Sequence, residues 1–327
     1  MQAIIIIFLL ALTVTTVSTP WAQKAALALG FVDAPQKRKL HSTPMPLLGG
    51  VAIFAGAIVG ILALVGSLSQ PVIGGLLAAG TVALVGLIDD RWPLPPFAKF
   101  GGQVLGFVIL VYFGVQVQLP VPNWLNIVIT FVWVIGISNA INFLDNMDGL
   151  SAGVSGVAAA FMLLLATIHD QYLVAALSAA LLGATLGFLR YNFKPAQIFM
   201  GDTGSLFLGC LLAILGLQLR FPNNVNFVTW MVPVLILGLP IFDMTLVVIS
   251  RLRRGVSPMT AGKDHTSHRL VARGFSQREA VLMLYLASGL FGMIAVFVTQ
   301  ATVLEVYVLG AGSAVCASYA IYRLEEA

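Results

Sequence analysis

Long apolar runs separated by short polar connections fill the sequence from its first residues to its last. A helix needs about 20 mostly apolar residues to cross the hydrocarbon core of a bilayer, and about eleven runs meet or approach that length. These runs are residues 2–19, 48–67, 72–88, 103–119, 124–141, 152–169, 171–189, 205–219, 227–249, 280–300 and 302–322. We therefore predict an all-α fold, a polytopic transmembrane helical bundle, with residues 1–327 forming one integral membrane domain.

The first apolar run, residues 2–19, has no positively charged residue ahead of it and no clear small-residue cleavage site after it. A cleaved signal peptide normally has both, so we predict a retained helix with the N-terminus outside. The odd-numbered helices then lead into connections on the opposite, cytoplasmic side. These connections are about residues 20–47, 89–102, 142–151, 190–204 and 250–279.

Composition and charge placement support this topology. Hydrophobic residues make up 59% of the chain and charged residues only 9%, far below the roughly 25% typical of a soluble domain. Of the 17 Lys and Arg residues, all but Arg220 fall in these five connections or at the C-terminus. Cytoplasmic segments carry such an excess, so we predict a multi-pass protein of the cytoplasmic (inner) membrane with a cytoplasmic C-terminus. The basic residues form no stripe typical of nucleic-acid binding.

Acidic residues gather on the same side, which the topology rule does not require. Only Asp170 and Glu305 fall outside, and Asp243 lies within the ninth predicted helix. Asp89 and Asp90 end the third helix, where adjacent carboxylates repel each other unless a cation or a proton offsets them. Taken alone, this pair is explained as simply by a solvated helix end.

Two further polar motifs suggest a metal and a phosphate. Asn142, Asp145 and Asp148 recur at every third position, which predicts one face of a helical turn and suits Mg²⁺. Capping of two helix ends is the alternative. The stretch 199–205 (FMGDTGS) precedes the eighth predicted helix, where its glycines would let a phosphate approach the helix N-terminus. Within it, Asp202 could hold a metal, or Asp202 or Thr203 could simply cap the helix.

The longest cytoplasmic connection, residues 250–279, is rich in basic residues and holds His265 and His268, which could face together on a helical turn. Zinc would lack nearby ligands there, whereas donors of this kind suit a diphosphate. A positive-inside anchor with bystander histidines is the alternative. Because four motifs converge on one membrane face, they predict transfer of a phosphate-bearing group from a water-soluble, nucleotide-linked donor to a lipid.

These residues resemble the polyprenyl-phosphate N-acetylhexosamine-1-phosphate transferases of glycosyltransferase family 4, and more distantly phospho-N-acetylmuramoyl-pentapeptide transferase. The resemblance runs from about Lys37 to Arg278. Its motifs are Lys39-x-His41 before Pro46-Leu47-Leu48-Gly49-Gly50, Asp89-Asp90 followed by Lys99 and Gln103, Asn142-x-x-Asp145-Asn146-x-Asp148-Gly149, Asn192 ahead of Phe199-Met200-Gly201-Asp202-Thr203-Gly204-Ser205, and Pro240-Ile241-Phe242-Asp243.

The resemblance implies that a UDP-N-acetylhexosamine, first of all UDP-GlcNAc, reacts with undecaprenyl phosphate. The products would be a polyprenyl-diphosphate-sugar, which initiates a cell-wall or surface glycan, and UMP. Mg²⁺ would be required, with Mn²⁺ as a substitute, and a homodimer is compatible with the family.

The resemblance also implies roles for individual residues. Asn142 and Asp202 would hold the metal, and the catalytic residues would be Asp89, Asp90, His265 and His268. The substrate would be bound by Lys99, Asp145, Asp148, Asn192, Phe199 and Arg269. Asp89 or Asp90 would deprotonate the lipid phosphate or attack as a nucleophile. Direct attack by the lipid phosphate is simpler, because a phosphate monoester is already a competent nucleophile.

Two alternatives stay open at this point. Residues 264–269 read DHTSHR and lack the triple-histidine run of the muramoyl-pentapeptide enzyme, which favours an N-acetylhexosamine donor over the peptide-bearing one. A secondary transporter would place ionisable groups near the bilayer midplane, whereas only Asp243 is clearly intramembrane here.

Overall fold

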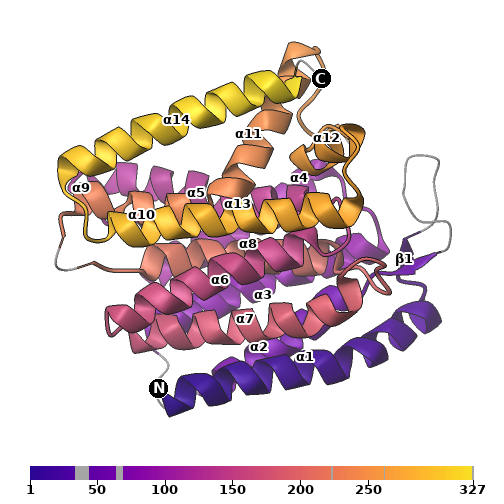
Figure 1. The fold of residues 1–327 in the computed structure, drawn as a ribbon. Coiled ribbons are helices and arrows are strands. Elements are labelled where there is room, and N and C mark those ends of the chain that lie inside the picture. The colour runs from indigo at the N-terminus through magenta and orange to yellow at the C-terminus, as the bar shows by residue number, and fades with distance from the viewer. Residues whose placement is uncertain (34–43, 64–68, 222–223, 261, 326–327) are drawn as a thin grey trace.

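Figure 1 shows the chain as a bundle of helices that lie mostly side by side, in a computed structural model that describes residues 1–33, 44–63, 69–221, 224–260 and 262–325. The N-terminus and the C-terminus lie at opposite ends of this bundle. We call the end that holds the C-terminus, β1 and α12 the charged end, and the other end the far end. The elements are α1 (Gln2–Leu29), β1 (Val32–Asp33), β2 (Met45–Pro46), α2 (Gly49–Leu62), α3 (Gln70–Arg91), α4 (Pro96–Tyr112), α5 (Asn123–Leu144), α6 (Leu150–Ile168), α7 (Tyr172–Asn192), α8 (Gly201–Gln218), α9 (Asn226–Thr229), α10 (Met231–Ile236), α11 (Gly238–Arg253), α12 (Thr266–Ala272), α13 (Gln277–Val298) and α14 (Val303–Glu325).

Helices of membrane-spanning length make up most of the described chain. Eight are long and apolar enough to cross a bilayer, namely α1, α3, α5, α6, α7, α8, α13 and α14. The shorter apolar helices α2 and α4 belong to the same bundle. The prediction of a polytopic helical membrane protein is confirmed. The last residues of the predicted span 48–67 lie outside the described residues.

The predicted span 227–249 is wrong as a continuous helix, because α9, α10 and α11 replace it. Proline has no backbone N–H to donate to the carbonyl four residues earlier, so it interrupts the helical ladder at that carbonyl. Pro233 interrupts the ladder at Thr229, where α9 ends, and Pro240 interrupts it at Ile236, where α10 ends. The two prolines therefore account for both breaks.

Several predicted connections are shorter than expected, because polar residues at a membrane surface can still be helical. α1 continues through Pro20 to Leu29 and takes the beginning of the predicted loop 20–47. α3 runs to Arg91 and α4 begins at Pro96, so the predicted loop 89–102 shrinks to residues 92–95. Likewise α8 begins at Gly201, so residues 201–205 form its first turn and do not precede it.

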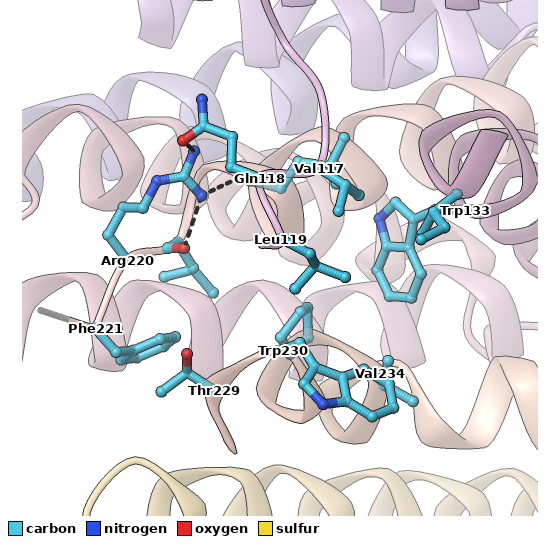
Figure 2. A pocket seen from close by; sticks show the side chains of 14 residues that line it. Val117, Gln118, Leu119, Trp133, Arg220, Phe221, Thr229, Trp230 and Val234 are labelled. Atoms are coloured by element: carbon cyan, nitrogen blue, oxygen red, sulfur yellow. Dashed lines mark hydrogen bonds between the residues drawn. The ribbon is translucent and has the colours of Figure 1, made fainter. Parts of the chain in front are cut away.

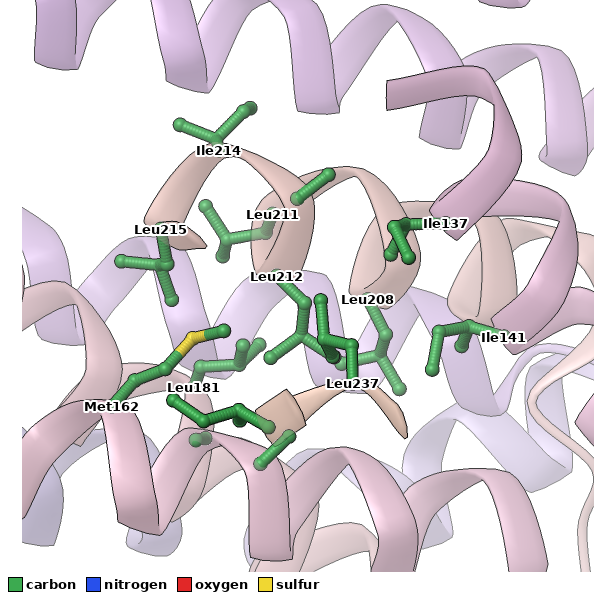
Figure 3. Packing of buried hydrophobic residues seen from close by; sticks show 14 of the residues in the cluster. Ile137, Ile141, Met162, Leu181, Leu208, Leu211, Leu212, Ile214, Leu215 and Leu237 are labelled. Carbon is green, nitrogen blue, oxygen red and sulfur yellow. The ribbon is translucent and has the colours of Figure 1, made fainter. Parts of the chain in front are cut away.

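α8 is the buried axis of the bundle, with nearly all of its side chains shielded by other helices. Figure 3 shows the α8 leucines beside Ile137 and Ile141 of α5, Met162 of α6 and Leu181 of α7. The α8 leucines labelled there are Leu208, Leu211, Leu212 and Leu215. Lipid tails are as apolar as these residues, so helices in a bilayer associate through close packing more than through the hydrophobic effect.

Glycines let the helices approach α8 most closely at its N-terminus. Gly50 of α2 donates its N–H to the carbonyl of Met200 at 2.9 Å, and a Cβ on Gly50 would meet the backbone of Gly204. On the other side, a Cβ on Gly86 of α3 would meet the backbone of Asp202 and Thr203. The first turn of α8 is therefore held between the backbones of α2 and α3.

We expect Gly50→Ala to destabilise the protein, because its methyl group would overlap backbone atoms that cannot rotate away. Overpacking of this kind costs about 1–3 kcal/mol, which should lower the midpoint of thermal unfolding of the detergent-solubilised protein. Gly136→Ala is the matched control, since a Cβ there meets nothing within 4 Å, and its midpoint should stay equal or rise. Equal midpoints for the two variants would contradict this packing.

Candidate active site

The N-terminus of α8 forms the centre of the charged end. The carboxylate of Asp90, in the last turn of α3, accepts hydrogen bonds from the backbone N–H of Asp202 at 2.8 Å and of Thr203 at 3.0 Å, and from the Thr203 hydroxyl at 2.6 Å. First-turn N–H groups have no helical partner and carry the positive end of the helix dipole. Gly201, at φ 65°, leaves the space that the Asp90 carboxylate fills.

One lysine joins two carboxylates beside this cap. Nζ of Lys99, in the first turn of α4, lies 2.6 Å from Oδ2 of Asp89 and 2.6 Å from Oδ2 of Asp202. The other oxygen of Asp89 accepts the backbone N–H of Leu94 at 2.7 Å. Asp89 and Asp202 therefore share one ammonium group, which offsets the repulsion between their negative charges.

α5 supplies the amide on the other side of Asp202. Nδ2 of Asn142 donates to Oδ1 of Asp202 at 3.0 Å and to the Ser205 hydroxyl at 2.9 Å. Between α4 and α5, the amides of Gln103 and Asn139 exchange hydrogen bonds at 2.7 and 3.3 Å. This paired amide contact fixes the helix that carries Lys99 against the helix that carries Asn142.

The single helical face predicted for Asn142, Asp145 and Asp148 is wrong, because α5 ends at Leu144. In the turn that follows, Asn146 donates its side-chain amide to the carbonyl of Phe143 at 2.7 Å, a local bond that competes with helix continuation. Asp148 instead accepts the backbone N–H of Ala196 at 3.0 Å and faces Lys194 at 3.3 Å.

Asp145 lies in that turn among other carboxylates. Burial above all, together with the negative charges of Asp202, Asp90 and Asp148, raises the pKa of its carboxyl group to about 8. Carboxylates so close together need a proton or a cation to offset their repulsion.

The histidine loop, residues 264–269, packs against the turn that follows α5. Nδ1 of His265 lies 2.8 Å from Oδ2 of Asp243, and the other oxygen of Asp243 accepts the backbone N–H of Thr266 at 2.7 Å. The hydroxyl of Ser267 donates to Oδ1 of Asn146 at 2.6 Å. The fully buried Asp243 thus sets the orientation of His265. The sequence assigned no role to Asp243, although its place inside an apolar run was a signal.

His265 and His268 do face each other, with ring centroids 5.8 Å apart. Burial above all, together with the nearby His265 and Lys263, lowers the pKa of His268 to about 4. His268 is therefore neutral at neutral pH. Its Nδ1 is buried and has no hydrogen-bond partner in the described part of the chain.

The side chains of two predicted substrate-binding residues form hydrogen bonds within the protein, mostly to backbone groups. The Asn192 amide accepts the N–H of Gly149 at 3.0 Å and donates to the carbonyl of Ile198 at 2.9 Å. The Arg269 guanidinium donates to the carbonyl of Asp264, the hydroxyl of Ser250 and the carbonyl of Leu324. Both side chains shape the loops around the site.

Phe199, the remaining predicted substrate-binding residue, immediately precedes the first turn of α8. Its N–H donates to the carbonyl of Pro46 at 2.8 Å, and its carbonyl accepts the N–H of Gly49 at 3.0 Å. The backbone of Phe199 therefore connects β2 and α2 to α8. The first-loop motif with Lys39 and His41 lies outside the described residues.

Asp264 anchors the start of the histidine loop. Its carboxylate binds Arg251 through two hydrogen bonds of 2.8 and 2.9 Å and Arg254 at 2.5 Å. Burial alone would raise the pKa of Asp264, but the two guanidinium groups outweigh it and lower that pKa to about 2. The carboxylate therefore stays charged at any physiological pH.

Taken together, the apolar helices and this cluster define a multi-pass membrane protein with a carboxylate-rich polar centre at one end. A model of glycosyl transferase family 4 matches residues 72–220. The chain is 36% identical, over 93% of its own length and 87% of the relative's, to a Bacillus subtilis (strain 168) protein named probable undecaprenyl-phosphate N-acetylglucosaminyl 1-phosphate transferase.

Two further relatives extend the comparison. A Mycolicibacterium smegmatis protein named decaprenyl-phosphate N-acetylglucosaminephosphotransferase is 31% identical over 89% of this chain and 80% of the relative. An Escherichia coli K12 protein named undecaprenyl-phosphate alpha-N-acetylglucosaminyl 1-phosphate transferase is 28% identical over 86% of this chain and 80% of the relative. This chain belongs to glycosyl transferase family 4, which confirms the predicted family and enzyme class.

Asp243→Asn should disturb the histidine loop, because His265 and Thr266 face different oxygens of Asp243 and one of these oxygens becomes an NH2 group. Leaving one buried donor unpaired costs about 1–3 kcal/mol. We expect a lower midpoint of thermal unfolding, and a changed His265 tautomer in the spectrum of ¹⁵N-histidine-labelled protein. Thr245→Val, on the exposed side of the same helix, is the control. A His265 signal that is the same in all three proteins would refute the role given to Asp243.

Proposed function

We propose that this enzyme transfers N-acetylglucosamine-1-phosphate from UDP-GlcNAc to undecaprenyl phosphate, which yields undecaprenyl-diphosphate-GlcNAc and UMP and initiates a surface glycan. The observation that carries this proposal is the group around the N-terminus of α8, where Asp202 meets both Lys99 and Asn142. The names of the three relatives support the choice of sugar and lipid.

The position of the site suits one substrate from water and one from the bilayer. The cluster lies at an end of apolar helices, so a polyprenyl chain can stay in lipid while its phosphate reaches the charged end. All but one of the Lys and Arg residues belong to this side in the sequence. We therefore place the charged end in the cytoplasm, where nucleotide sugars are made. The homodimer remains an expectation from the family resemblance.

The reaction is a displacement at phosphorus. An oxygen of undecaprenyl phosphate attacks the phosphorus that carries GlcNAc, the bond from that phosphorus to the bridging oxygen breaks, and UMP leaves with the bridging oxygen. A phosphate monoester is already a competent nucleophile, so no aspartyl intermediate is needed. The protein must mainly position the two phosphates and offset their negative charge.

The donor set suits Mg²⁺. Asp202 and Asn142 would hold the ion, because Mg²⁺ takes one or two carboxylates and leaves further positions to water and substrate phosphates. The convergence of Asp89 and Asp202 on one ammonium supports a cation at this point. When bound, the ion would neutralise the donor diphosphate. In the described residues, no three His, Cys, Asp or Glu side chains group around a point that could hold a metal, so substrate oxygens must complete the coordination.

The two adjacent aspartates have different partners and, we propose, different tasks. Both oxygens of Asp90 are engaged by the first turn of α8, so Asp90 positions Asp202. Oδ2 of Asp89 forms an ion pair with the ammonium group of Lys99, which sits at the end of a flexible side chain. Asp89 is therefore the better placed to take a proton from the incoming lipid phosphate, while Lys99 moves to a substrate phosphate. The neutral His268, and His265, which Asp243 orients, would contact substrate phosphates.

We expect Asp202→Asn to lower the transfer rate at least about 100-fold, since one change removes the charge that holds the metal and Lys99. The assay uses purified protein, undecaprenyl phosphate, Mg²⁺ and a panel of UDP-sugars, and it measures UMP and lipid-linked sugar. Asp170→Asn is the matched control: it makes the same change at the far end, where the positive φ of 53° also suits asparagine.

UDP-GlcNAc should be the preferred donor of the panel. Full activity of a correctly inserted Asp202→Asn variant would refute the site, and preference for UDP-N-acetylmuramoyl-pentapeptide would refute the sugar. Chelation of divalent cations should abolish product formation, and added Mg²⁺ should restore it.

A further inference from the structure

A mainly apolar cavity lies at the far end of the bundle, away from the charged cluster. It has a volume of about 250 Å³ and is formed by the segment before α5, by α5 itself, by the end of α8 and by α9 and α10. Its lining residues include Leu119, Trp133, Phe221, Trp230 and Val234. An apolar cavity of roughly 150 Å³ already takes up small apolar molecules, so this one has room for part of a lipid chain.

Arg220 is the charged residue of this cavity. Nη1 of its guanidinium donates to the carbonyl of Leu217 at 2.7 Å and contacts that of Leu219 at 3.4 Å, and Nη2 donates to Oε1 of Gln118 at 3.3 Å. These partners are neutral, and Arg220 forms no ion pair with a carboxylate among the described residues. Its Nε–H is not used by these bonds.

The Arg220 side chain is exposed at the edge of the cavity, and its partly desolvated guanidinium has only neutral partners, so an anion bound there would add the ion pair that is missing. Burial lowers the pKa of Arg220 accordingly. Figure 2 shows Arg220 and Gln118 on one side of the cavity, with Trp133, Trp230 and Val234 across from them. The cavity is therefore amphipathic, with a cationic edge and an apolar interior.

The cavity also has the depth expected for a lipid in the leaflet at the far end. Arg220 lies two residues after α8 ends at Gln218, and Trp133 lies almost three turns inside α5. Tryptophan is enriched where headgroups meet acyl chains. At 1.5 Å per residue, the length of α8 puts the Gln218 end about 24 Å from Asp202, so this cavity is separate from the proposed transfer site.

We propose that this cavity binds an anionic phospholipid, with an acyl chain among the apolar residues and the phosphate on Arg220. A free inorganic anion would pair with the guanidinium but leave the apolar walls uncovered. A zwitterionic lipid would fill the walls but bring its own cation to the arginine. An anionic lipid satisfies both halves of the cavity without bringing a second cation to the arginine. The bound lipid would also contact residues of α5, α8 and α10 at the same time.

The test is binding, so it does not depend on the proposed transfer activity. The full chain, in phosphatidylcholine nanodiscs with a minor share of phosphatidylglycerol, is scored by mass spectrometry for phosphatidylglycerol that stays bound after transfer to detergent. We expect retention by the unmodified protein. Arg220→Gln should bind about 10- to 100-fold more weakly, the loss of a charged hydrogen bond. Arg190→Gln, an exposed arginine at the charged end, should bind like the unmodified protein.

A second variant tests the apolar half of the cavity without changing any charge. Val234→Trp should fill the interior and reduce retention, while Arg220 remains intact. The thermal midpoint should rise with added phosphatidylglycerol only in proteins that retain it, and this measurement also verifies that each variant is folded.

Three results would overturn the proposal. The first is equal retention by Arg220→Gln and Arg190→Gln. The second is displacement of phosphatidylglycerol by inorganic phosphate, which would make this a simple anion site. The third is displacement of phosphatidylglycerol by undecaprenyl phosphate at lower concentration, which would make the cavity part of the substrate path.

Discussion

The carboxylate of Asp90 on the first turn of α8 is the interaction on which the rest of the site depends. It joins α3 to the most buried helix of the bundle and accepts the backbone N–H groups of Asp202 and Thr203. Gly50 and Gly86 allow the backbones of α2 and α3 to come close enough for this bond to form. Asp202 is then held between Lys99 and Asn142, each from a different helix.

Electrostatics explains why this chemistry lies at the end of the bundle and not within it. Carboxylates inside a bilayer are costly, and here they are offset by a helix N-terminus, by Lys99 and by their closeness to water. Asp243, which is fully buried within α11, has both carboxylate oxygens in contact with partners, His265 and the backbone N–H of Thr266. The same constraint makes Arg220 unusual, since it is the basic residue that the sequence leaves at the far end.

Apolar run length predicted most of the membrane helices, and the predicted topology placed Asp89, Asp90, Asn142 and Asp202 on one side, where the structure brings them together. The breaks after Thr229 and Ile236 were missed, because hydropathy does not register that a proline lacks an N–H. The helical face through Asp148 failed because a local side-chain bond of Asn146 accompanies the end of α5. The structural roles of Asn192 and Arg269 depend on contacts between distant segments, which no local pattern reveals.

The central claim is that Asp90, which need not touch the metal, fixes Asp202 so that a metal can bind. Mn²⁺ binding to the full chain, measured by electron paramagnetic resonance in the presence of UDP-GlcNAc, tests this most directly. Residues that orient a ligand typically change metal affinity 10- to 100-fold. The account predicts a loss of about that size in Asp90→Asn, in a protein that still folds. Affinity for Mn²⁺ equal to that of the unmodified protein would contradict it.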